Sequence, residues 1–211
     1  VVRPAYTMGG TGGGFVHSDE DMETIAHRGL QASPITQILV EESILGWEEL
    51  EVEVIRDAKN QMISVCFIEN VDAVGVHTGD SYCNAPMMTI APELQRRCEE
   101  TAHRIVSEIG VIGGTNVQLA HHPATGRLVV IEINPRTSRS SALASKATGL
   151  PIAMVSTLLA AGLTLDEIPY WRDGTLDKYT PEGDYVVAKF ARWAFEKFPG
   201  AVDKLGTQMR A

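Results

Sequence analysis

Three oxygen-bearing side chains near the middle of the chain are spaced to bind a metal ion. Gln118 lies fourteen residues before Glu132, and Asn134 follows Glu132 by two positions. Residues 115–121 and 128–134, on either side of a Pro-Ala-Thr-Gly turn, predict a β-hairpin. Gln118 is expected to face Glu132, and Asn134 to share that face, because side chains alternate along a strand. The patch would carry a carboxylate and two amide oxygens, which suit a hard cation such as Mg²⁺.

Two arginines, Arg136 and Arg139, follow the predicted hairpin and could contact the phosphates of a nucleotide held by the same metal ion. The alternative is a solvated polar face on a half-exposed sheet. Taken alone, the residues are more typical of that solvated face, because single Glu and Asn residues are common on strands. The metal hypothesis therefore depends on what the rest of the chain supplies.

Residues 8–14 contain five glycines between two extended stretches. The segment lacks the Lys-Ser/Thr pair of a P-loop, and its spacing differs from G-x-G-x-x-G. Glycine lets backbone N–H groups point at phosphate oxygens without a side-chain clash, so we interpret the segment as a flexible lid over a phosphate. A mobile surface turn is the alternative. We favour the lid because so many glycines cost conformational entropy on folding.

Several loop residues are weaker candidates for nucleotide binding. The carboxylate of Glu42 could accept the amino group of adenine, and backbone groups around Ile44 could contact the ring nitrogens. Glu49 could bind ribose hydroxyls. His77, in a loop with Gly, Thr and Asp, could donate to a phosphate, and Arg3 could reach another. Each of these residues is also compatible with an ordinary solvated loop.

The composition of the 211-residue chain excludes several classes of protein. Its net charge of -9 argues against nucleic acid or an anionic membrane as the main partner, but not against ATP. Cys66, Cys83 and Cys98 are far apart, so we expect no disulfide or zinc site and interpret each as a buried small side chain in a reducing cytosol. No apolar run has membrane-spanning length and no signal peptide is recognised, so the expected location is cytoplasmic.

Hydrophobic periodicity and turn signals predict an α+β domain. One helix is expected after Ser18, whose side chain opens a capping box with Asp21. Further helices are predicted at 92–109, with Gly110 as cap, at 140–148 and at 151–161, and strands at 38–40 (buried), 50–56 (half-buried), 62–68 and 184–190. Residues 69–91 are expected to be mostly loop. This order favours an antiparallel sheet covered by helices on one face.

The order of the motifs along the chain resembles that of the ATP-grasp superfamily. More narrowly, it is similar to the large subunit of carbamoyl-phosphate synthetase, and the similarity covers essentially the whole chain. The segments that carry it are residues 3–14, 74–80, 116–118 and 132–149. That large subunit has two homologous ATP-grasp halves. Residues 138–145 and 184–190 are similar to the first half, which makes carboxyphosphate.

The resemblance implies an ATP-grasp fold that lacks its N-terminal subdomain and carries a small Gly-rich lid. The implied division is a lid subdomain in residues 1–41, a C-type subdomain with the metal site in 42–168, and a C-terminal extension in 169–211. The missing subdomain supplies another phosphate-binding arginine in the family, and the segment around Gly113 is one residue shorter than the family pattern. We therefore expect the isolated chain to bind ATP poorly and not to turn over.

The resemblance also implies an ATP-dependent ligase. ATP with Mg²⁺ or Mn²⁺ would phosphorylate bicarbonate, and ammonia from a glutamine amidotransferase small subunit would convert the carboxyphosphate to carbamate. The second ATP-grasp half of the parent chain would complete carbamoyl phosphate for arginine and pyrimidine biosynthesis. The implied metal ligands are Gln118, Glu132 and Asn134; the implied nucleotide-binding residues are Arg3, Gly9, Gly10, Glu42, Ile44, Glu49, Gly75, Val76, His77, Gln118 and Glu132; and the implied catalytic residues are His77, Arg136 and Arg139.

Three alternatives stay open. The chain could belong to another ATP-grasp ligase, such as a biotin-carboxylase-like enzyme, or to the second half of the same large subunit. It could also be a non-catalytic nucleotide-binding module. A requirement for bicarbonate or for carbamate separates the enzymes, and replacing Glu132 by Gln separates a metal ligand from a surface residue.

Overall fold

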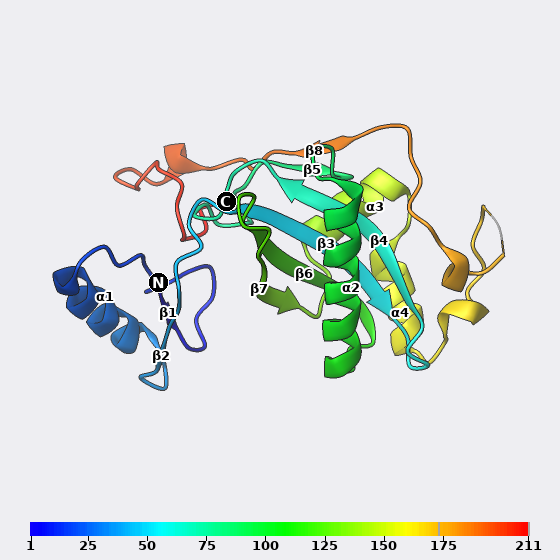
Figure 1. The fold of residues 1–211 in the computed structure, drawn as a ribbon, viewed down its shortest axis with the longest axis horizontal. Coiled ribbons are helices and arrows are strands. Elements are labelled where there is room, and N and C mark those ends of the chain that lie inside the picture. Colours follow the sequence, from blue (N-terminus) through cyan, green and yellow to red (C-terminus); the bar gives the residue numbers. More distant parts are fainter. Residues whose placement is uncertain (173, 211) are drawn as a thin grey trace. The chain divides into compact units, whose positions relative to one another are not determined.

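The computed structural model describes residues 1–172 and 174–210, which form two compact units (Figure 1). The first, the small unit, consists of Val1–Trp47, Asp72–Ser81 and the chain from Phe190 onward. The second, the sheet unit, consists of Glu48–Val71 and Tyr82–Lys189. The three-part division at residues 41 and 168 stays a prediction.

The small unit contains a two-stranded antiparallel sheet and one long helix. β1, Val2–Pro4, pairs with β2, Ile38–Val40, and the helix α1, Asp19–Ala32, lies between them in sequence. Ser18 caps α1 by accepting the N–H of Asp21 at 3.1 Å, which confirms one half of the predicted capping box; the carboxylate of Asp21 accepts the N–H of His17 at 3.2 Å instead of that of Ser18. The expected burial of residues 38–40 is wrong, because β2 belongs to a two-stranded sheet that leaves its apolar side chains more than half exposed at two of three positions.

The sheet unit is built on six antiparallel strands in the order β7-β6-β3-β4-β5-β8. Two long hairpins, β3–β4 and β6–β7, form most of it, and both were predicted. The strands are β3 Glu48–Arg56, β4 Met62–Asn70, β5 Cys83–Ala85, β6 Gly113–His121, β7 Leu128–Asn134 and β8 Val187–Lys189. β5 lies in the stretch that was expected to be loop, and β8 is shorter than the strand predicted there. Both are three-residue strands that carry little periodic signal.

Helices cover both faces of this sheet. α2, Pro92–Ile109, ends at Gly110, whose φ of +75° closes the helix, and its buried side chains join an apolar cluster on one face. α3, Arg139–Thr148, and α4, Ile152–Ala160, join a second cluster on the other face. Figure 1 shows α2 in front of the sheet and α3 and α4 behind it. The expectation of helices on one face was therefore wrong, because the central strands carry apolar side chains on both sides.

The central strand β3 is buried on both faces, whereas we predicted a half-buried strand. Its glutamates Glu49, Glu51 and Glu53 alternate with apolar residues, and each is at most 3% exposed. β3 lies between β4 and β6, and Ser141 of α3 donates to the carboxylate of Glu53 at 2.9 Å. Three carboxylates thus lie inside the sheet unit rather than in water.

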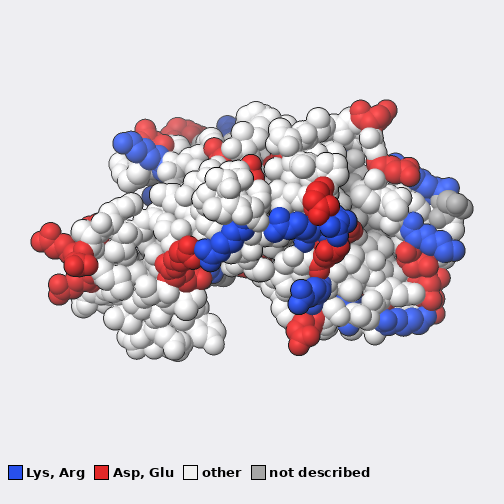
Figure 2. All heavy atoms as spheres, in the orientation of Figure 1, with Lys and Arg blue, Asp and Glu red and all other residues white. Residues whose placement is uncertain are grey.

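The three cysteines are buried free thiols, which confirms their interpretation as small core side chains. Burial raises the pKa of the Cys66 thiol to about 12, so the reactive thiolate is disfavoured. Among residues 1–172 and 174–210, no single helix is long and apolar enough to cross a membrane; α3 and α4 reach that criterion only as a pair bent by 110°. On the face drawn in Figure 2, basic and acidic side chains are interspersed.

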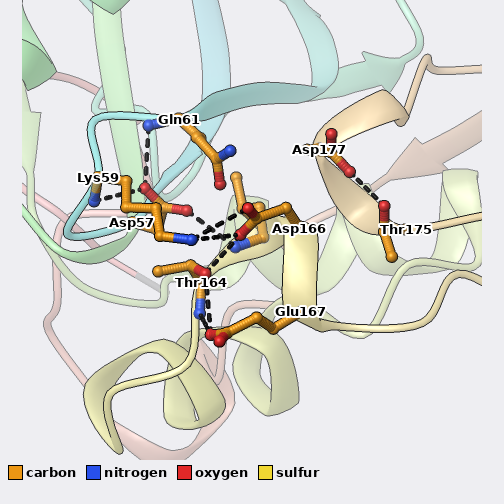
Figure 3. A network of polar contacts seen from close by, with 9 residues as sticks. Asp57, Lys59, Gln61, Thr164, Asp166, Glu167, Thr175 and Asp177 are labelled. Carbon is orange, nitrogen blue, oxygen red and sulfur yellow. Dashed lines mark hydrogen bonds and ion pairs between the residues drawn. The ribbon is translucent and has the colours of Figure 1, made fainter.

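A polar network holds the turn between β3 and β4 against the short helix η1, Leu165–Glu167 (Figure 3). The buried carboxylate of Asp57 accepts the backbone N–H groups of Lys59 at 2.9 Å, Gln61 at 2.9 Å and Leu165 at 2.8 Å. The ammonium of Lys59 forms a surface ion pair with Asp166 at 3.0 Å. Two further single turns are η2, Leu176–Lys178, and, in the small unit, η3, Phe195–Lys197.

Asp57→Ala is expected to lower the free energy of unfolding by about 2 kcal/mol, because it leaves a buried N–H donor without its acceptor. Urea unfolding of the 211-residue chain measures the change. Lys59→Met is the matched control, because it removes only the exposed ion pair of the same network and should change stability little. Equal losses of unfolding free energy in the two variants would contradict the role of Asp57 in holding the β3–β4 turn against η1.

Candidate metal site

The hairpin β6–β7 places the three predicted metal ligands as expected. Gln118 pairs with Glu132, and Asn116 pairs with Asn134, with a register irregularity just after Gln118. The predicted pairing of Gln118 with Glu132 is confirmed. Paired residues share a face of the sheet, so a carboxylate oxygen and two amide oxygens lie on one surface.

β3 extends this polar face inward. Glu51 pairs with Gln118, and Glu53 pairs with Asn116. Two polar rows therefore cross the three strands: Glu51–Gln118–Glu132 and Glu53–Asn116–Asn134. The sequence interpretation missed Glu51, Glu53 and Asn116. The signal was present in the alternating glutamates of β3, but a strand with one wet face has the same pattern.

The outer end of the site is half-exposed and hydrogen-bonded to an arginine. Asn134 Nδ2 donates to Glu132 Oε1 at 3.1 Å, and Arg136 Nη2 donates to Asn134 Oδ1 at 3.1 Å. Arg136 also lines a surface hollow of about 390 Å³ next to Gly113 and Ser156. One carboxylate with two amides is a sparse ligand set that leaves room for phosphate oxygens around Mg²⁺.

The inner end of the site is buried and rich in donors. Asn116 Nδ2 donates to Glu51 Oε2 at 2.8 Å and to Glu53 Oε1 at 2.9 Å. Asn70 donates to the other oxygen of Glu51 at 2.9 Å. Burial and the nearby charge of Glu51 raise the pKa of Glu53 to about 7, although hydrogen bonds from Ser141 and Asn116 oppose the shift.

The start of α3 fixes the second predicted arginine. Ser138 accepts the N–H of Ser141 at 3.1 Å, and Ser141 accepts the N–H of Ser138 at 2.9 Å, which forms a reciprocal cap. Arg139 is the first residue of the helix that follows. The chain thus carries Arg136 directly after β7 and Arg139 at a helix N-terminus, both in the sheet unit.

The Gly-rich segment of the small unit is a tight loop that returns to β1. Val2 and Gly14 exchange backbone hydrogen bonds at 2.9 and 3.1 Å. Gly9 and Gly10 have φ of +63° and +75°, and the Met209 N–H donates to Gly9 O at 2.9 Å. A Cβ atom on Gly10 would lie 2.1 Å from the carbonyl oxygen of Thr207. The loop therefore contacts a C-terminal segment that sequence reasoning did not connect with it.

Gly10→Ala is expected to disrupt this loop, because the new methyl group meets backbone and the residue must keep a positive φ. Limited proteolysis of the 211-residue chain should show faster cleavage within residues 8–14. Gly206→Ala is the control, since a Cβ there meets no heavy atom within 4 Å. An unchanged cleavage rate in Gly10→Ala would show that the loop does not hold this conformation.

The loop that carries His77 is anchored inside the small unit. The His77 N–H donates to Gly206 O at 2.7 Å, and His77 Nδ1 accepts the Gly79 N–H at 3.0 Å. Asp80 in the same loop accepts the Trp193 indole N–H at 3.2 Å. Hydrogen bonds within the small unit thus hold the backbone of this loop in place.

The predicted nucleotide residues fall in both units. Arg3 pairs with Glu41 at 3.1 Å on the surface of the small unit. Of the predicted residues, the small unit carries Arg3, Gly9, Gly10, Glu42, Ile44, Gly75, Val76 and His77, and the sheet unit carries Glu49, Gln118, Glu132, Asn134, Arg136 and Arg139. Their roles stay predictions.

Comparison with known proteins identifies the family. The family described as "Carbamoyl-phosphate synthase L chain, ATP binding domain" matches residues 1–168. Along its whole length the chain is 52% identical to the carbamoyl phosphate synthase large chain of Thermotoga sp. (strain RQ2) and 53% identical to that of Kocuria rhizophila. It spans 19% of the length of each of these relatives.

Two solved structures of biotin carboxylases share this fold. The biotin carboxylase domain of Hydrogenobacter thermophilus 2-oxoglutarate carboxylase, in complex with MgADP, ADP and bicarbonate, matches with a TM-score of 0.68 and 19% identity, over 83% of this chain and 38% of that one. Campylobacter jejuni biotin carboxylase in its β,γ-ATP complex matches with a TM-score of 0.69 and 19% identity, over 83% of this chain and 39% of that one. The fold is that of an ATP-grasp domain, and the chain belongs to the family of carbamoyl-phosphate synthase large-chain ATP-binding domains.

Proposed function

We propose that this chain is the ATP- and metal-binding segment of the first, bicarbonate-phosphorylating half of a carbamoyl phosphate synthase large chain. The observation that carries the proposal is the paired row of Gln118 and Glu132 with Asn134 beside it, in a family described as an ATP-binding domain. Assignment to the first half is supported by residues 138–145 and 184–190, which resemble that half.

Gln118, Glu132 and Asn134 fit a hard cation, since all three offer oxygen atoms on one face of the β6–β7 hairpin. We propose that they hold Mg²⁺ or Mn²⁺. The bound ion would neutralise charge on the phosphates of ATP. Arg136 already donates to Asn134 at 3.1 Å, so a ligand and a phosphate-binding group are held together at this edge.

The residues of this chain would act mainly by positioning groups and neutralising charge, which is how phosphoryl transfer is usually catalysed. A bicarbonate oxygen attacks the γ-phosphorus of ATP, the bond to the β–γ bridging oxygen breaks, and carboxyphosphate and ADP form. In the proposal His77, Arg136 and Arg139 stabilise the charge on the transferred group. These side chains donate hydrogen bonds to its oxygens and form no covalent bond with it.

The remaining site residues would bind the nucleotide itself. Arg3, Gly9 and Gly10 are proposed to hold its phosphates, where the positive φ of both glycines turns the loop backbone. Glu42, Ile44 and Glu49 would bind adenine and ribose. Gly75 and Val76 would line the nucleotide site; Gly75 has φ of +130°, and a Cβ on it would meet Leu45 at 2.5 Å.

The wider reaction follows from the proposal. Ammonia delivered by a glutamine amidotransferase small subunit would displace phosphate from carboxyphosphate and give carbamate, which the second ATP-grasp half of the parent large chain would phosphorylate. The expected setting is cytoplasmic arginine and pyrimidine biosynthesis. The 211 residues alone are expected to bind ATP poorly and to show no turnover.

Phosphate release from Mg-ATP by the parent large chain, with and without bicarbonate, tests the proposal. Stimulation by bicarbonate supports carboxyphosphate synthesis. Release that is indifferent to bicarbonate would favour a different ATP-grasp ligase. Because the parent large chain carries both halves, Glu132→Gln assigns the segment: loss of the bicarbonate-stimulated release supports the first half, and loss of only the carbamate-dependent release would assign the segment to the second half.

A further inference from the structure

We infer that Asn116 is a positioning residue that fixes which way the side-chain amide of Gln118 turns. The inference rests on the metal site proposed above, because Gln118 is one of its ligands. A metal ion binds the oxygen of an amide and is repelled by its NH₂ group, so the orientation of Gln118 decides whether it can act as a ligand at all.

Asn116 lies at the centre of three hydrogen bonds. Its Nδ2 donates to Glu51 Oε2 at 2.8 Å and to Glu53 Oε1 at 2.9 Å, and its Oδ1 accepts from Gln118 Nε2 at 3.1 Å. Asn116 is 1% exposed, as are both glutamates. Water therefore cannot replace these bonds without rearranging the core of the sheet unit.

The two carboxylates determine the orientation of Asn116. Ionised carboxylate oxygens only accept hydrogen bonds, so the NH₂ group of Asn116 must face them. The reversed amide would place Oδ1 against two acceptors and leave a buried NH₂ group without partners, which is costly in a dry interior. Because an amide is planar, Oδ1 then faces away from the glutamates and toward Gln118.

The orientation of the Asn116 amide in turn determines that of the Gln118 amide. Its Oδ1 can only accept, so the NH₂ group of Gln118 turns toward it, and Gln118 Oε1 points away from Asn116. Gln118 pairs with Glu132 on the next strand. The buried pair Glu51 and Glu53 thus sets the direction of a metal ligand through one intervening amide. Such supporting residues commonly change metal affinity by about 10–100-fold.

The test is a double-mutant cycle in the parent large chain at pH 8, above the pKa of about 7 of Glu53, so that this carboxylate acts as an acceptor. Asn116→Ala is combined with Gln118→Glu, because a carboxylate presents oxygen in either orientation and needs no positioning. The readout is the dissociation constant of Mn²⁺ in the presence of ADP, from the electron paramagnetic resonance signal of free Mn²⁺. Binding to the nucleotide alone is subtracted, and so is binding to the second ATP-grasp half, measured in Glu132→Ala.

We expect Asn116→Ala to weaken Mn²⁺ binding by about 10-fold or more when Gln118 is unchanged, and by less than about 2-fold in the Gln118→Glu background. Equal weakening in both backgrounds would show a merely structural role and overturn the inference. No weakening in either would overturn it too. The second ATP-grasp half of the parent chain keeps its own metal site, so Glu132→Ala should remove only part of the bound Mn²⁺. No loss of bound Mn²⁺ at all would overturn the proposed metal site, and with it this inference.

Asn70→Ala is the matched control. Asn70 is a buried asparagine whose Nδ2 also donates to Glu51 at 2.9 Å, but it lies on β4, which β3 separates from the strand of Gln118. It should weaken Mn²⁺ binding far less than Asn116→Ala does, and a loss equal to that of Asn116→Ala would overturn the inference. If Asn116→Ala does not fold, Asn116→Ser takes its place, since its hydroxyl can still donate to one carboxylate but is too short to hold Gln118.

Discussion

Glu132→Gln in the parent large chain is expected to abolish bicarbonate-stimulated phosphate release, with a loss of at least about 100-fold. The amide keeps the shape of the side chain but removes the only negative charge among the three proposed ligands. Several kcal/mol of charge stabilisation by the metal ion would be lost with it, and every 1.4 kcal/mol corresponds to about a tenfold change in rate.

The fold should survive this change, because Glu132 lies at an exposed position of the strand β7. Circular dichroism and the thermal midpoint should match those of the unmodified chain. Raising the Mn²⁺ concentration should restore part of the rate, since the introduced amide would still offer an oxygen atom. Glu108→Gln, at an exposed position of α2, is the control for loss of a single carboxylate.

Two results would contradict the prediction. Bicarbonate-stimulated release at the normal rate in Glu132→Gln would mean that this carboxylate is a surface residue. Detectable bicarbonate-dependent hydrolysis by the isolated 211 residues would mean that the segment does not need the rest of a large chain.

The hairpin with the metal ligands could be predicted because its signals are local. A turn of four residues and two strands fix which positions face each other, so Gln118 and Glu132 could be paired from their numbers alone. The helix caps at Ser18 and Gly110 were predictable for the same reason. Each depends on residues within one turn of the chain.

The buried half of the site could not be predicted because its partners are distant in sequence. Glu53 meets Asn116, 63 residues later, and Ser141, 88 residues later. Alternating glutamates on β3 predict a strand with one solvent-exposed face unless these partners are known. Burial is not expected from the sequence, because a carboxylate is rarely buried without hydrogen-bond donors. For residues 38–40 the error was the opposite one: burial was predicted and the side chains are largely exposed. An apolar run is buried only if another layer of the structure covers it.

The buried carboxylate of Glu53 predicts a large dependence of the free energy of unfolding on pH. Its pKa in the folded chain is about 7, compared with 4.5 for an ordinary glutamate, because burial and the charge of Glu51 disfavour the ionised form. The folded chain therefore binds this proton more tightly than the unfolded chain. The contribution of Glu53 to the free energy of unfolding is therefore most favourable below pH 4.5, and this contribution is lost as the pH rises through 7.

Glu53→Gln should remove this penalty, because the amide is neutral at every pH. A shift from 4.5 to about 7 corresponds to roughly 3 kcal/mol at pH 8, with the variant more stable, and to about 1 kcal/mol at pH 5. Urea unfolding of the 211-residue chain and its variant at both pH values measures the effect, with Glu108→Gln as an exposed control. A difference in stability that is the same at pH 5 and pH 8 would show that Glu53 does not titrate in this range, and that the donors Asn116 and Ser141 outweigh its burial.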